Sequence, residues 1–371
     1  MRGMLNNMPL TQIMLIAGVV TLAAALLLVL TQKWHGHFSA DGDSGVQKIH
    51  EHAPPRIGGV AIICGLATFC LMSGPAVVSI STPMLLACLP AFLSGLAEDI
   101  TKKVSVLARL LATMLSGFLA YLLTGVAMQN TGFAPLDWLL AITPVAVCFT
   151  LFAVGGVANA INIIDGCNGL ASGAVGIMMV AMGLISLSVG DVPLSTVSFV
   201  IAAISLGFCA ANWPLGKIFL GDGGAYLLGF LLAWVAILLP MRNPQLSGWT
   251  TLLVCAYPVL EVVFSVLRRR SREGHHPGQP DKVHLHHLVH RRLVCHMFPS
   301  ISSRMKNGLT SPFCWVGVAL PAGLAILFAQ NIFMLSVSFA GVAFLYSVVY
   351  TRLSQFHWCL SAQKNSLPPV L

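Results

Sequence analysis

The chain contains few charged residues. Of its 371 residues, only 9% are Asp, Glu, Lys or Arg, whereas 57% are hydrophobic and the mean hydropathy is +0.85. A soluble globular domain carries roughly 25% charged residues. The composition therefore excludes a soluble protein and predicts an integral membrane protein.

The sequence also lacks any paired-cysteine motif. Its ten cysteines include no Cys-x-x-Cys pair, and several lie inside apolar runs, such as Cys64, Cys70, Cys88 and Cys209. Cysteines of this kind usually serve as small apolar side chains in packed helices. The pattern argues against a disulfide framework and against a cysteine-ligated metal.

Apolar runs long enough to cross a bilayer recur along the chain. Runs of about 17–23 residues between polar breaks predict an all-α polytopic protein with eleven transmembrane helices. The first run is too long for a signal-peptide core and lacks a small-residue cleavage site. We therefore expect a single integral membrane domain over residues 1–371. The predicted spans are 10–32, 57–74, 82–97, 106–127, 137–157, 169–190, 194–211, 223–240, 248–267, 312–329 and 332–350.

The basic residues fall almost entirely on one side of this topology. That side, with Arg109 just inside the fourth span, holds 18 of the 20 Lys and Arg residues, and the other holds only Arg2 and Arg242. By the positive-inside rule the rich side is cytoplasmic and the N-terminus is periplasmic. Topology and membrane lipids account for the positive charge, so no nucleic-acid partner is expected. The cytoplasmic segments are predicted to be 33–56, 98–105, 158–168, 212–222, 268–311 and the tail from 351.

One polar stretch separates two apolar runs near the middle of the chain. An Asp at the bilayer centre costs about 2.5–3.5 kcal/mol, so such groups face water, protein or substrate. Asn159, Asn162 and Asp165 are spaced to share one helical face. Gly166 and Gly169 are then expected to end the helix. A plain turn capped by Asn and Asp is the alternative.

Two more acidic motifs lie on the same predicted side. Glu98 and Asp99 end the third span, and adjacent carboxylates repel each other unless a cation or a shared proton compensates. They suit a metal or phosphate site, and a solvated helix end paired with Lys102 is the alternative. Asp222 lies among glycines where the eighth span begins, and helix amides there favour anions. A simple N-cap role for Asp222 is the plainer interpretation.

Basic motifs also fall on this side. Lys48, His50 and Arg56 precede the second span and are candidate phosphate contacts, with a positive-inside flank as the alternative. Arg268 opens an arginine run after the ninth span, which alone indicates a topogenic or lipid-binding segment.

A histidine cluster follows the arginine run. His284, His286 and His287 form a His-x-His-His motif that suits either zinc or phosphate. No Cys or carboxylate lies beside it at a strict structural zinc spacing, so the motif alone does not choose between them.

Taken together, these five motifs resemble the polyprenyl-phosphate N-acetylhexosamine-1-phosphate transferase family. They cover residues 48 to 287, and the eleven-span layout resembles the N-acetylglucosamine-type branch over nearly the whole chain. Each motif is weak alone, but five in order on one membrane face make a specific match. The matching pieces are KIHEHAPPRIGG, LAEDITKK, NAINIIDGCNGL, FLGDGGA and VHLHH.

The resemblance implies a reaction and its partners. Family members move a sugar 1-phosphate from a UDP-N-acetylhexosamine to undecaprenyl phosphate, releasing UMP, with Mg²⁺ and with Mn²⁺ as an alternative ion. We therefore expect a transferase of the bacterial inner membrane that initiates a lipid-linked polysaccharide such as O-antigen. Two anionic substrates must meet, which fits a site of metal-binding carboxylates and fixed cations. A homodimer is compatible with this reading.

The resemblance also assigns residues. Asp222 matches a metal ligand, Asp99 a carboxylate that activates the lipid phosphate or binds metal, and Asp165 an aspartate of the nucleotide motif. These three are the expected metal ligands, and with His284 they are the expected catalytic residues. The expected substrate contacts are Lys48, His50, Arg56, Glu98, Lys102, Asn159, Asn162, Asn168, Phe219, Arg268, His286 and His287, with Phe219 stacking on uracil.

Two positions depart from the family pattern. Glu98 and Asn168 stand where the family usually has aspartate, which puts the role of the first carboxylate in doubt. Asn168 cannot act as a base, so we expect it to contact sugar or nucleotide. Because Asp99, Asp165 and Asp222 are all present, we expect an active enzyme.

Two other functions were weighed. A secondary transporter would place polar groups near the midplane on repeated, interrupted helices, whereas here they gather at one surface and no internal repeat is visible. The phospho-N-acetylmuramoyl-pentapeptide transferase of peptidoglycan synthesis is the alternative within the family.

Overall fold

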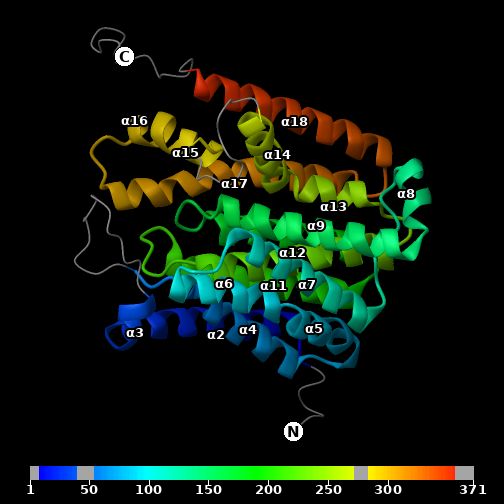
Figure 1. Ribbon diagram of the computed structural model, residues 1–371, viewed down its shortest axis with the longest axis horizontal. Helices are drawn as coiled ribbons and strands as arrows, with labels where there is room; N and C mark the ends of the chain where they lie inside the picture. Colours follow the sequence, from blue (N-terminus) through cyan, green and yellow to red (C-terminus); the bar gives the residue numbers. More distant parts are fainter. Residues whose placement is uncertain (1–7, 40–53, 271–282, 356–371) are drawn as a thin grey trace.

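The computed structural model describes residues 8–39, 54–270 and 283–355, and within these ranges the protein is built from helices without β-strands (Figure 1). Nine helices are long and apolar enough to cross a membrane, or ten when one bent pair counts as a span. This confirms an all-α multi-pass membrane protein. The nine are α2 (Leu10–Leu30), α5 with α6 (Pro75–Thr101), α7 (Val106–Thr124), α9 (Thr143–Ile164), α10 (Leu170–Ser188), α11 (Val192–Asn212), α12 (Gly221–Arg242), α17 (Ser303–Leu327) and α18 (Ile332–Ser354).

Every one of the eleven predicted segments contains helix, and three of them are irregular. The second is only 15 residues long in the structure, as α4 (Gly58–Met72). The ninth is the bent pair α13 (Gly248–Val254) and α14 (Ala256–Arg270), which changes direction by 79°. In Figure 1 α14 stands steeply against the other long helices. The third span is also divided, into α5 (Pro75–Ala87) and α6 (Leu89–Thr101), with a proline near the start of α6.

Two predicted boundaries are wrong because the helices are longer than the predicted spans. Helix α9 continues to Ile164, seven residues beyond the predicted end of its span, so Asn159 and Asn162 lie on this helix, as their spacing predicted. Helix α17 begins at Ser303, nine residues before its predicted span. The predicted spans stop at polar side chains. A membrane helix can continue past such side chains where they face protein or a water-filled cavity.

Helix α12 forms the centre of the molecule. In its most apolar 18-residue window 89% of the residues are buried, against 22% in α2 and 11% in α18. Helices α4, α6, α9 and α10 pack around it. The closest approach uses glycine, because a Cβ on Gly95 of α6 would lie only 2.5 Å from the backbone nitrogen of Gly223. The start of α12 is therefore fixed against α6.

The connecting segments gather at two opposite ends of the bundle. Figure 1 shows α3 (Gln32–Ser39), α15 (Leu285–Val289) and α16 (Cys295–Met297) at one end, and α8 (Ala134–Leu140) at the other. At the α8 end, Asp191 caps α11 and receives two hydrogen bonds from Arg242, at 2.7 and 2.9 Å. The polar motifs of the sequence lie at the α3 and α15 end.

Candidate active site

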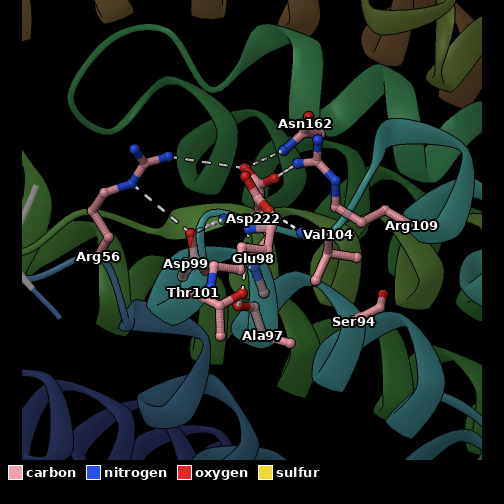
Figure 2. A network of polar contacts seen from close by, with 12 residues as sticks. Arg56, Ser94, Ala97, Glu98, Asp99, Thr101, Val104, Arg109, Asn162 and Asp222 are labelled. Atoms are coloured by element: carbon pink, nitrogen blue, oxygen red, sulfur yellow. Dashed lines mark hydrogen bonds and ion pairs between the residues drawn. The ribbon is translucent and has the colours of Figure 1, made fainter. Parts of the chain in front are cut away.

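The carboxylate of Asp222 is held by cationic and amide groups from three other segments (Figure 2). Asn162 of α9 donates from Nδ2 to Asp222 Oδ1 at 3.1 Å, and Arg109 of α7 forms an ion pair with Oδ2. Arg56 approaches Oδ1 at 4.0 Å. The N-cap residue of α12 is Leu220, without a side-chain cap. The N-cap role weighed for Asp222 is therefore wrong: its side chain faces outward to Arg109, Arg56 and Asn162.

The first turn of α12 is instead capped by Asp99 from α6. The two carboxylate oxygens of Asp99 accept the backbone N–H groups of Asp222 at 2.9 Å and Gly223 at 2.8 Å. These are amides that a helix N-terminus leaves without partners, and the helix dipole favours a negative charge there. Asp99 is 1% exposed, and Arg56 Nε lies 3.8 Å from Oδ1. Arg56 thus bridges the two aspartates.

Gly221 makes this close approach possible. Its φ is +72°, and a Cβ there would overlap the carbonyl oxygen of Arg56 and lie 2.5 Å from Asp99 Oδ2. We expect Gly221→Ala to lower the melting temperature and to reduce activity at least about tenfold, since it displaces Arg56 or Asp99. Gly125→Ala is the matched control, because Gly125 has φ +70° with nothing within 4 Å of a Cβ. Both variants carry the left-handed backbone cost of about 1–2 kcal/mol. If the two behave alike in thermal melts and activity assays, the close packing at Gly221 is unimportant.

A polar pocket of about 260 Å³ opens beside the Asp99–Asp222 cluster. Arg56 belongs to both, so it joins the pocket to the cluster. Residues from the α9–α10 connection, from the turn before α12 and from α17 supply the walls. The lining residues are Arg56, Asp165, Gly166, Cys167, Asn168, Asn212, Phe219, Leu220, Gly221 and Asn307.

Asp165 is the carboxylate that faces this pocket. It ends α9, and within the described part of the chain its side chain has no hydrogen bond or ion pair. The surrounding protein desolvates the carboxylate and raises its pKa well above the ordinary range, although the side chain remains partly accessible. The positive charge of Arg56 offsets part of this rise in the pKa of Asp165. Asp165 is therefore an under-compensated acid at the edge of the pocket.

The two departures from the family pattern have structural partners. The backbone N–H of Asn168 donates to Asn307 Oδ1 at 2.7 Å, and its Nδ2 donates to the carbonyl of Pro214 at 3.0 Å. An aspartate could not make the second bond unless it were protonated. Glu98 Oε2 accepts the N–H of Val104 at 2.7 Å and so holds the turn between α6 and α7. Asn168 still lines the pocket, whereas Glu98 does not.

The three histidines lie together next to the α9–α10 connection. The His284 and His286 rings are parallel, with centroids 5.7 Å apart, and the His286 and His287 centroids are 4.2 Å apart. His286 packs so tightly on Gly166 that a Cβ there would overlap its Nε2. Burial lowers the pKa of His287 and lowers that of His286 well below the usual value. His286 is therefore a neutral packing group at neutral pH.

Other predicted contacts are not brought to the pocket. Lys48 and His50 lie outside the described residues. Arg268 donates to the carbonyl oxygen of Val283 at 3.2 Å and to the hydroxyl of Tyr350 on α18 at 2.6 Å. Lys102 ends α6 with a left-handed φ of +56° and is exposed. Asn159 is half-buried one turn before Asn162, with no hydrogen bond inside the described ranges.

The structure adds residues that the motifs did not indicate. Arg109 was counted only as a positive-inside residue, although a lone arginine inside an apolar helix was a usable signal. Asn212 and Asn307 line the pocket from segments with no motif. Glu261 of α14, which belongs to none of the five motifs, lies with its Oε1 2.8 Å from His284 Nδ1.

The donor chemistry of the cluster fits a hard cation in part. Carboxylate oxygens of Asp165 and Asp222 and the amide oxygen of Asn162 are ligand types that Mg²⁺ prefers. However, no three His, Cys, Asp or Glu side chains in the described ranges converge as a ready metal site. Arginine already neutralises Asp222. A metal would therefore compete with Arg109 for this carboxylate.

Comparisons with known proteins agree with the family resemblance. A model described as glycosyl transferase family 4 matches residues 81–240, which include the three aspartates. The undecaprenyl-phosphate alpha-N-acetylglucosaminyl 1-phosphate transferase of Yersinia pestis is 27% identical over 283 residues, 75% of this chain and 73% of that protein. That of Escherichia coli K12 is 28% identical over 288 residues, 75% and 72% of the two chains. A probable undecaprenyl-phosphate N-acetylglucosaminyl 1-phosphate transferase of Bacillus subtilis is 28% identical over 302 residues, 78% and 80%.

Proposed function

Because the chain belongs to glycosyl transferase family 4, we propose that it transfers an N-acetylhexosamine 1-phosphate from a UDP-sugar to undecaprenyl phosphate and releases UMP. The observation that carries the proposal is the polar pocket joined by Arg56 to a cluster of aspartates and arginines. Such a cluster suits substrates that carry several phosphate charges. The names of the similar proteins support undecaprenyl phosphate as the acceptor.

The pocket suits the nucleotide half of the donor. Phe219 offers an aromatic face for uracil, and its backbone is fixed by a 2.8 Å hydrogen bond from its N–H to the carbonyl of Pro55. The backbone N–H groups of Gly166, Asn168 and Gly169 already donate within the protein. Side-chain amides that line the pocket, such as those of Asn168 and Asn307, would therefore supply the polar contacts for ribose or sugar. Asn168 fits this assignment because it lines the pocket. Its Nδ2 already donates to the carbonyl oxygen of Pro214.

Arg56 and Arg109 are placed to bind the phosphates. In the transfer, an oxygen of the lipid phosphate forms a bond to the β-phosphorus of the UDP-sugar. The bond between that phosphorus and the bridging oxygen breaks, and the oxygen leaves with UMP. Fixed guanidinium groups offset the repulsion between the two anions and stabilise the charge on the leaving UMP.

Asp165 and Asp222 are the residues that would hold Mg²⁺, or Mn²⁺ in its place. A bound divalent ion would neutralise phosphate charge and orient the pyrophosphate. The ion would compete with Arg109 for Asp222, and a guanidinium freed from that ion pair could bind a phosphate oxygen. Asn162 keeps Asp222 oriented through its hydrogen bond.

We favour direct displacement over a covalent aspartyl intermediate. A phosphate monoester with a second pKa near 6 is already mostly dianionic at pH 7, so it attacks with little need for a base. Asp99 has both oxygens occupied by backbone N–H groups, which makes it a poor nucleophile or base. Its role is to fix the start of α12.

The membrane assignments complete the proposal. We place the active site on the cytoplasmic face of the bacterial inner membrane, in accord with the distribution of Lys and Arg residues. A second, apolar cavity of about 330 Å³ lies between α9, α12 and the α13–α14 bend. Its lining suits a prenyl chain and not a nucleotide, since nearly all of its surface is hydrocarbon.

The test is UMP release by purified protein in detergent. The assay contains undecaprenyl phosphate, Mg²⁺ and a panel of UDP-N-acetylhexosamines. We expect UMP only when lipid and metal are both present, and the productive donor identifies the sugar. A stoichiometric burst of UMP without lipid would contradict direct displacement. Folded protein that neither releases UMP from any donor nor binds UMP with Mg²⁺ would refute the transferase.

A further inference from the structure

Glu261 is a buried acid that the transfer mechanism has not yet used. It lies on α14 and is 1% exposed. Its Oε1 is 2.8 Å from His284 Nδ1, and its two oxygens accept the N–H of Leu285 at 3.1 and 3.3 Å. The hydroxyl of Tyr346 on α18 donates to Oε2 at 2.7 Å. Glu261 therefore joins the histidine segment to two membrane helices.

These contacts fix how His284 presents its ring. Both Leu285 and Tyr346 donate to Glu261, so the carboxylate is satisfied as an acceptor and the His284 nitrogen facing it, Nδ1, carries a proton. The other nitrogen, Nε2, has no hydrogen bond within the described residues and is left to meet a ligand. When Nε2 also carries a proton, it can donate to an anion.

The stacked rings of His284 and His286 connect Glu261 to the wall of the pocket. His284 lies parallel to His286, and His286 rests on Gly166, which lines the pocket next to Asp165. No separate charged side chain in the described ranges holds His286, whose Nδ1 is buried without a hydrogen bond. The position of His284 therefore depends on Glu261, and the pocket wall at Gly166 depends on both rings.

We propose that Glu261 is a positioning residue for the transfer reaction, acting through His284. It holds Nδ1–H of His284 and so fixes the orientation of the ring, with the edge that carries Nε2 left to meet a phosphate oxygen of the substrates. The inference rests on the proposed transferase function. It differs from a purely structural role, in which Glu261 would only tie α14 to α15 and α18.

A double-mutant cycle separates the two roles. Glu261→Gln, His284→Gln and the double variant are compared by kcat and KM for UMP release, with melting temperature and UMP affinity as checks on folding. We expect Glu261→Gln to lower kcat about 10- to 100-fold with little change in UMP affinity. In the His284→Gln background the same change should have almost no further effect on kcat, because both act as one unit.

Tyr346→Phe is the matched control, since it removes one hydrogen bond from the same carboxylate and keeps its charge and its contact with His284. It should retain kcat within about threefold. If Glu261→Gln does not fold, Glu261→Asp takes its place in the cycle, because it keeps the charge and withdraws it from His284.

Three results are decisive. An equal loss of kcat from the Glu261 change in both backgrounds overturns the positioning role. So does a Glu261→Gln enzyme with wild-type kcat. A wild-type protein that releases no UMP from any donor overturns the transferase and with it the positioning role, whereas the first two results, seen with an active wild-type enzyme, overturn the positioning role alone.

Discussion

Replacing Asp222 with asparagine is expected to reduce the rate of UMP release by about 10²–10³-fold. The amide keeps the shape of the side chain, but it removes the negative charge that faces Arg109, Arg56 and Asn162. Arg109 then loses its ion-pair partner in this cluster, Arg56 keeps only the contact with Asp99 among the two aspartates it bridges, and a divalent ion would lose a ligand. The measurement is kcat for UMP release at saturating donor and lipid, with binding of UMP as a check that the pocket persists.

Asp191→Asn is the control for this variant. Asp191 is also held by an arginine and an asparagine, Arg242 and Asn243, but at the opposite end of the bundle. We expect it to lower thermal stability and to leave kcat within about twofold. An Asp222→Asn enzyme that keeps more than a third of wild-type kcat would remove Asp222 from the catalytic machinery.

Asp165→Asn is expected to stabilise the substrate-free protein while reducing UMP release about 10²-fold or more. The carboxylate is desolvated and lacks a hydrogen bond among the described residues, so its ionised form is held at a cost. The neutral amide avoids this cost. In the reaction, however, the missing charge is needed to bind metal or to balance cations near the pyrophosphate. Stability and activity should therefore change in opposite directions.

The pH dependence of stability gives a second signature of Asp165. Its pKa is raised in the folded protein, whereas in the unfolded chain the group ionises near pH 4. Between these two values the native state binds more protons than the unfolded state, so stability falls as pH rises through the window. The wild-type melting temperature should decline from about pH 4 toward neutral pH. The melting temperature of Asp165→Asn should decline less, since this variant has no carboxyl group at position 165 to titrate.

Thermal melts from pH 4 to 8 compare the two proteins directly. Asn162→Ala is the matched control, because it removes a hydrogen bond of the same helix end without removing a titrating group. If the melting temperature of Asp165→Asn is lower than that of wild type at neutral pH, the ionised carboxylate does not destabilise the protein and the prediction is wrong.

Much of the site could be predicted from the sequence because its residues interrupt apolar runs. Asp99, Asp165, Asp222 and Asn162 each stood out as polar groups at the ends of membrane segments. The structure places them around one pocket and one cluster. What these side chains do there was less predictable. Asp99 caps a helix that lies more than a hundred residues further along the chain.

The residues that contact these polar groups could not be predicted from the sequence, for a different reason. Arg109 and Asn307 belong to the site only because α7 and α17 pack beside it, and no local spacing encodes that packing. Asn168 shows the same limit at a single residue. Its departure from aspartate is explained by the carbonyl of Pro214, a contact between two loops that the sequence keeps apart.

The short helix α4 has a consequence for the surrounding bilayer. Fifteen residues rise only about 22 Å, whereas the hydrocarbon core is about 30 Å thick. Such a hydrophobic mismatch is relieved when the bilayer thins locally around the helix. Because α4 begins at Gly58, immediately after Arg56 and Ile57, thinning there draws lipid headgroups down toward Arg56. The membrane itself would then help to deliver the phosphate of a long-chain lipid, whose tail stays in hydrocarbon, to the depth at which the aspartates lie.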